Sequence, residues 1–158
     1  MKKIIISTLF VIIIFSCNNK NSKEIPNEVI VIVELVKNKD KSEEELKKFT
    51  KRYSDYVKST EPNTLGWTYH DAGDKIILIE RYKDEDANII TAKNISPGGN
   101  RYKLLQESFD YHSLEKVTVI GGFTQKLVDF NKMTAEKVGF TSPFLYYPLI
   151  SGYSKNLK

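Results

Sequence analysis

One carboxylate interrupts an otherwise apolar strand face. Residues 75–82 read as a strand, and alternation places Glu80 on the same face as Ile76 and Leu78. A carboxylate on such a face is costly to bury unless it is paired, hydrogen-bonded or protonated. Burial would raise its pKa toward the range useful for taking a phenolic proton. Glu80 is therefore a candidate general base; the alternatives are a pair with Arg81 of a neighbouring subunit and a cap for the following helix.

An aromatic strand face precedes this carboxylate. Trp67 and Tyr69 alternate with small or polar residues, and the turn at 71–74 joins them to the strand of Glu80 as a hairpin. The aromatic pair predicts either the wall of a ligand pocket or ordinary core packing. His70 and His112 would titrate near neutrality. We expect His70 to be solvated beside the turn and His112 to interact with helix-terminal carbonyls.

The single cysteine follows a short apolar leader. Lys2 and Lys3 precede an apolar run at 4–15, which as a helix spans about 18 Å, well short of a hydrocarbon core of about 30 Å. Ser16 followed by Cys17 resembles the lipobox of bacterial lipoproteins. We therefore expect residues 1–16 to be a signal peptide, Cys17 to be lipidated, and residues 17–27 to be a flexible tether. This predicts a lipid-anchored protein of the cell envelope; a plain signal-peptide cysteine and a permanent transmembrane anchor are the alternatives.

Composition excludes several classes of function. The 158 residues carry 24 Lys and Arg against 20 Asp and Glu, a net charge of +4 without a clustered basic face. We therefore expect no nucleic-acid partner. One cysteine and two histidines argue against a disulfide framework and against a metal site built from Cys and His. The sequence contains no GxSxG, phosphate-loop or HExxH motif.

Hydrophobic patterning predicts an α+β fold of the ferredoxin-like class. The order is β-α-β-β-α-β with an extra helix and a tail, which implies an antiparallel sheet with helices on one face. The first strand is apolar at both parities, so its second face needs a cover, and a homodimer supplies one. The predicted strands and helices span 28–36, 43–59, 65–70, 75–82, 83–94, 100–110, 116–120 and 125–138, with an extended aromatic tail at 143–153.

Three segments resemble the antibiotic biosynthesis monooxygenase (ABM) family. They are TEPNTLGW at 60–67, ERYKDEDA at 80–87 and PLISGYS at 148–154, and the resemblance covers nearly all of residues 28–158. The family implies a dimeric α+β barrel and a monooxygenase that acts on a small quinol or phenol without cofactor or metal. Thr91 stands where many family members have histidine.

The resemblance assigns roles to five residues. It implies Glu80 and Asn94 as catalytic residues, and Trp67, Tyr69 and Tyr82 as residues that bind a small aromatic substrate. Tyr82 and Asn94 would donate hydrogen bonds to an oxyanion. Three functions stay open: an ABM-type oxygenase, a non-catalytic envelope protein that binds small aromatic or apolar ligands, and a dimeric structural lipoprotein with a vestigial pocket.

Overall fold

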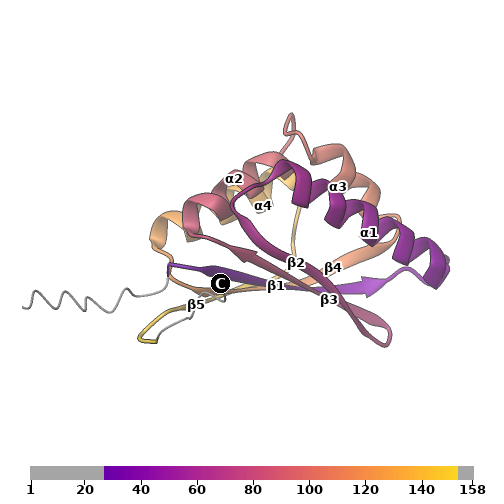
Figure 1. The fold of residues 1–158 in the computed structure, drawn as a ribbon, viewed down its shortest axis with the longest axis horizontal. Helices are drawn as coiled ribbons and strands as arrows, with labels where there is room; N and C mark the ends of the chain where they lie inside the picture. Colours follow the sequence, from indigo (N-terminus) through magenta and orange to yellow (C-terminus); the bar gives the residue numbers. More distant parts are fainter. Residues whose placement is uncertain (1–26, 153–158) are drawn as a thin grey trace, which may run out of the picture.

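A single sheet carries helices on one of its faces in the computed structural model, which describes residues 27–152 (Figure 1). The strand order is β2-β3-β1-β4-β5. Neighbouring strands are antiparallel except β4 and β5, which are parallel. In chain order, the elements are β1 (Val29–Lys37), α1 (Glu43–Thr60), β2 (Thr64–Ala72), β3 (Lys75–Tyr82), α2 (Glu85–Ile95), α3 (Tyr102–Ser108), β4 (His112–Gly121), α4 (Gln125–Val138) and β5 (Phe144–Pro148).

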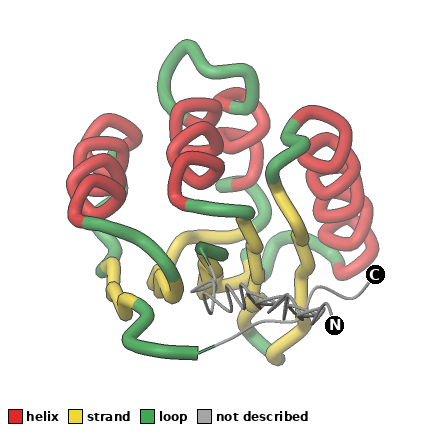
Figure 2. The backbone as a smooth tube through the Cα atoms, turned by 60° about the vertical axis from the view of Figure 1, so that its left-hand side comes forward, coloured by secondary structure: helices red, strands yellow, loops and turns green. Residues whose placement is uncertain are grey.

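The helices form one layer above the strands, as Figure 2 shows. The predicted capping box opens α1: Ser42 Oγ accepts from the Glu45 backbone amide, and the Glu45 carboxylate accepts from the Ser42 amide at 2.9 Å. Phe49, Tyr53 and Val57 then recur at helical spacing and are buried against the sheet. The predicted α+β ferredoxin-like fold is confirmed. In this fold, a site can be enclosed between the helix layer and the sheet.

The predicted C-terminal tail is wrong in one respect, because part of it is a strand. Residues 144–148 form β5, which pairs with β4 in parallel. The crossover through α4 brings the chain back to the edge of the sheet, where the Leu149 amide donates to Gly121 O at 2.8 Å. A five-residue strand with prolines at 143 and 148 has little local signal, and its pairing partner is distant in sequence.

The second face of the sheet has no helix over it within residues 27–152 (Figure 1). The central strand β1 is apolar at both parities, as predicted. Its inward residues are buried, whereas its outward residues are only partly covered. None of the described helices combines the length and apolar character needed to cross a membrane. The outer face, as we name this surface, carries Ile30, Ile32, Ile77, Ile79, Ile120, Leu145 and Tyr147.

Candidate functional site

A cavity of about 130 Å³ lies between the helices and the inner face of the sheet. For scale, an engineered apolar cavity of about 150 Å³ binds benzene, so the volume suits a small aromatic ligand. The two predicted functions that require a pocket, an oxygenase and a protein that binds small ligands, are therefore both compatible with the structure. The strand side chains that line it are mainly aliphatic: Val31, Val33, Leu35, Leu78, Val117 and Val119.

Glu80 lines this cavity from β3. Its neighbours across the sheet are Val31 on β1 and Trp67 on β2. The Tyr82 hydroxyl donates to the Glu80 carboxylate at 2.5 Å. Loss of hydration raises the pKa of Glu80 to about 7, although the Tyr82 hydrogen bond and the charge of Arg101 act in the opposite direction. The carboxyl group can therefore exist in either protonation state near neutral pH.

Arg101 also lies at this candidate site, and no pattern in the sequence indicated it. Its side chain is 1% exposed, and the guanidinium lies 4.9 Å from the centroid of the Trp67 ring and 5.5 Å from that of Tyr53. Nη1 forms an ion pair with Glu61 Oε1 at 2.9 Å. Nε has no hydrogen-bond partner among the described residues. A buried cation with unused donors therefore borders the cavity.

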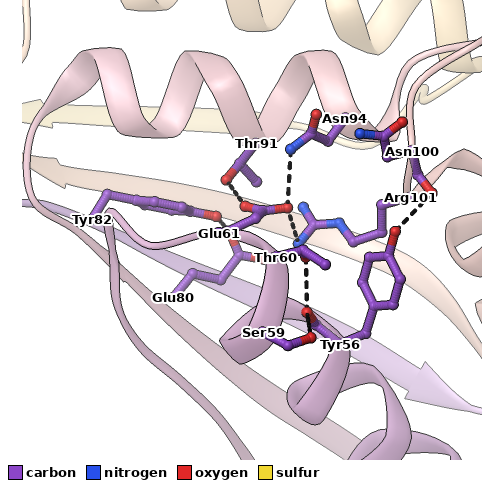
Figure 3. Close-up of polar contacts among 10 residues, drawn as sticks. All are labelled: Tyr56, Ser59, Thr60, Glu61, Glu80, Tyr82, Thr91, Asn94, Asn100 and Arg101. Carbon is purple, nitrogen blue, oxygen red and sulfur yellow. Dashed lines mark hydrogen bonds and ion pairs between the residues drawn. The ribbon is translucent and has the colours of Figure 1, made fainter.

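The loop before α3 fixes the position of Arg101. The Arg101 amide donates to Asn94 O at 2.9 Å, which folds residues 96–100 back onto the end of α2. Gly99 permits this approach, because a Cβ there would lie only 2.3 Å from Asn94 O. The backbone thereby brings the side chain of Arg101 beneath α2, opposite the C-terminal end of α1 (Figure 3).

Glu61, the residue that follows α1, is buried and has three polar partners. Thr91 Oγ1 donates to its Oε2, Asn94 Nδ2 donates to its Oε1 at 3.3 Å, and Arg101 supplies the ion pair (Figure 3). Thr91, at the position where many ABM proteins have histidine, is thus used to hold a carboxylate. Asn94 also serves Glu61 and is not among the residues that line the cavity.

The residues predicted to bind an aromatic ligand divide into two groups. Trp67 and Tyr69 line the cavity, and Trp67 stacks on Tyr53 with ring centroids 5.6 Å apart. Burial raises the pKa of Tyr69, so its hydroxyl stays protonated. Tyr82 is fully buried and reaches the cavity only through its hydrogen bond to Glu80. The strand alternation thus predicted which of these side chains face inward.

The histidines lie on opposite faces of the sheet. His70 is exposed and lies 3.0 Å from the Thr68 hydroxyl, as expected for a solvated residue. His112 is buried and lines the cavity, and neither ring nitrogen has a hydrogen-bond partner among the described residues. The expected contacts with helix-terminal carbonyls are therefore not formed. Burial lowers the pKa of His112 to about 4.

Within residues 27–152, no group of three or more His, Cys, Asp or Glu side chains is arranged to hold a metal ion. The predicted signal peptide and Cys17 lie outside the described residues.

Comparisons with known proteins support the fold. No protein-family model matches the sequence, and no curated protein matches it. The structure is similar to the crystal structure of MupZ from Pseudomonas fluorescens, with a TM-score of 0.61 and 19% identity, over 82% of this chain and 95% of that one. It also matches Rv0793 from Mycobacterium tuberculosis with a TM-score of 0.44 and 15% identity, over 61% of this chain and 96% of that one. At this level of identity, the first match bears on the fold alone.

Proposed function

We propose that this chain is an ABM-type monooxygenase that oxidises a small phenol or quinol with molecular oxygen and without a cofactor. One observation carries the proposal: the carboxyl group of Glu80 lies in an apolar cavity with its pKa raised to about 7. A base of that pKa is suited to removing a phenolic proton near neutral pH. The resemblance of residues 60–67 and 80–87 to ABM segments supports the same chemistry.

The reaction begins with proton transfer from the phenolic hydroxyl to Glu80. The phenolate is electron-rich and donates electrons to O2, one oxygen atom of which forms a new bond to a ring carbon. The other oxygen atom leaves as water. For a phenol with a free ring position, the products are one quinone and one water per O2, so that the phenol loses four electrons and O2 gains four.

Arg101 and Tyr82 support this step in different ways. Arg101 lines the cavity, and its Nε donor, which has no partner among the described residues, would hold the phenolate oxygen. The pKa of Tyr82 is raised well above its ordinary value by burial, so its hydroxyl stays protonated and keeps Glu80 oriented. Trp67 and Tyr69 supply an aromatic wall for the ring of the substrate.

Oxygen uptake with a panel of quinols and phenols tests the proposal. Glu80→Gln keeps the shape of the side chain and removes the base, so turnover should fall about 100-fold or more while the fold survives. Glu115→Gln is a matched control, because Glu115 lies on the surface in a pair with Lys75. An active wild type with an equally active Glu80→Gln variant would remove Glu80 from the mechanism.

A second candidate function is non-catalytic binding of small aromatic or apolar ligands. The observation that favours it is the use of Thr91 and Asn94 to hold Glu61, which leaves fewer donors for a reacting oxygen. Calorimetric binding of a phenol without any oxygen uptake would select this function over the oxygenase.

A homodimer and a lipid anchor complete the proposal. The outer face presents apolar side chains from four strands (Ile30, Ile32, Ile77, Ile79, Ile120, Leu145 and Tyr147), and a patch of this kind is typical of an interface. We expect two copies to pair through it, and a charge placed at Ile79 should shift the mass in light scattering from two chains to one.

Lipidation at Cys17 would attach the protein to the cell envelope, and loss of membrane association in Cys17→Ser would support it.

A further inference from the structure

His112 is buried without a hydrogen-bond partner at the first residue of β4. His112 is 6% exposed, and its ring packs edge-on against the ring of Phe49 with centroids 6.3 Å apart. Buried polar side chains are nearly always hydrogen-bonded, so an imidazole without a protein partner is a candidate to pair with a bound ligand. The proposed reaction at Glu80 does not use this residue.

The side chain of His112 borders the same cavity as Glu80. The nearby cavity lining includes Leu114 from its own strand and Leu35 from the neighbouring strand. With its pKa lowered to about 4, the imidazole is neutral and offers one donor and one acceptor. It therefore matches a hydroxyl or carbonyl group better than an ionic one.

Strand register gives the separation between this imidazole and the proposed base. Glu80 pairs with Val31, whereas His112 pairs with Lys37 on the same strand. Six residues of β1 span roughly 20 Å between the two backbones, of which the two side chains and one hydrogen bond at each end can cover about half. A single ring placed against Glu80 does not reach His112, so a ligand that satisfies both must be elongated.

We propose that His112 binds a hydroxyl or carbonyl oxygen at the far end of an elongated ligand, whose phenolic end lies at Glu80. The ligand class is then a phenol that carries a neutral polar group on a short chain or a second ring. The proposal rests on the proposed function only for the placement of the phenolic oxygen. Recognition of the far group is a property of binding and does not require that the ligand be oxidised.

A matched pair of phenols tests this recognition. 4-(3-Hydroxypropyl)phenol and 4-butylphenol have nearly the same shape and differ by a terminal hydroxyl in place of a methyl group. Calorimetry on the full-length chain under argon should give about tenfold tighter binding of the hydroxyl compound, the effect of one well-made hydrogen bond. In His112→Phe, the order should reverse, because the hydroxyl is then buried without a partner.

Two further variants separate recognition from stability. His112→Gln retains a donor and an acceptor and should restore part of the preference for the hydroxyl compound. Tyr146→Phe removes a buried hydroxyl, at a residue outside the cavity lining, and should leave the preference unchanged. His112→Phe should also raise Tm in the absence of ligand, because the variant no longer buries two ring nitrogens that lack protein partners.

The opposite results would overturn the proposal. If 4-butylphenol binds wild type as tightly as the hydroxyl compound, or if His112→Phe keeps the wild-type preference, the imidazole does not recognise the ligand. Binding of hydroquinone but of neither long phenol would reject the elongated ligand. A protein that shows the preference but consumes no oxygen would contradict the monooxygenase alone and leave this inference standing.

Discussion

Glu61 and Glu80 are carboxylates in the same interior region, but their surroundings differ. Glu61 has an ion pair with Arg101 and hydrogen bonds from Thr91 and Asn94. Glu80 has one donor, Tyr82, and its pKa is raised to about 7 by burial. A carboxylate with three partners holds its neighbours in place, whereas a carboxylate with one partner can exchange a proton. The difference separates the structural role of Glu61 from the chemical role that we propose for Glu80.

Breaking the ion pair at Glu61 should have the largest effect on stability. Arg101→Met leaves the Glu61 carboxylate buried without a countercharge, which should lower the free energy of unfolding by about 3–5 kcal/mol in urea denaturation. A Glu61→Gln, Arg101→Met double variant removes both charges and should recover most of this loss. If the single and the double variant are equally stable, Glu61 does not depend on Arg101.

A surface ion pair gives the matched control for Arg101. Arg52 pairs with Glu107 on the surface, and both side chains are well exposed. Arg52→Ala should change the free energy of unfolding by about 1 kcal/mol or less. A loss as large as that of Arg101→Met would show that burial is not the cause of the difference.

Glu80 and His112 should make the free energy of unfolding depend on pH in opposite directions. The folded state raises the pKa of Glu80 from 4.5 to about 7, so it favours the protonated acid, and stability is lost as pH rises from 4.5 through 7. It lowers the pKa of His112 from 6.5 to about 4, so it favours the neutral ring, and stability is lost as pH falls from 6.5 through 4. Each effect is worth about 3–4 kcal/mol over its full range.

Difference measurements separate the two groups, since their effects nearly cancel between pH 4.5 and 6.5. The free energy of unfolding of wild type minus that of Glu80→Gln should fall toward pH 8. The free energy of unfolding of wild type minus that of His112→Phe should fall toward pH 4. Urea denaturation at several pH values measures both. Parallel curves for wild type and Glu80→Gln would mean that folding does not change the pKa of Glu80.

The sequence predicted most of the fold because most of the elements have local signals. The capping box of Ser42 and Glu45 and the alternation of Trp67 and Tyr69 depend on residues a few positions apart. The strand β5 depends on pairing with β4 across a helix, and no pattern within five residues specifies that. Local periodicity therefore predicts elements better than it predicts their partners.

The residues of the candidate site also divide into those with a local sequence signal and those without one. Glu80 could be found because a carboxylate on an apolar strand face breaks a pattern of period two. Glu61 and Arg101 lie at helix ends, where charged residues are common and usually solvated, so nothing local indicates that they are buried together. Their pairing becomes visible only when the loop before α3 folds back onto α2.

Asn94 gives the smallest predicted effect, and it separates the sequence prediction from the structure. The resemblance implies that Asn94 donates to a reacting oxyanion, whereas the structure places its amide 3.3 Å from Glu61. If it only supports Glu61, Asn94→Ala should lower the free energy of unfolding by about 1 kcal/mol, because the bond is long and Glu61 keeps two other partners. Oxygen uptake at saturating phenol should then stay within twofold of wild type.

If Asn94 holds the oxyanion, turnover should instead fall about 100-fold or more with little change in stability. Thr91→Val is the comparison variant, because it also removes one donor to Glu61, and Thr91 lines the cavity without a proposed role in the reaction. Equal behaviour of the two variants would assign Asn94 to the support of Glu61, and a loss of turnover confined to Asn94→Ala would return it to the catalytic site.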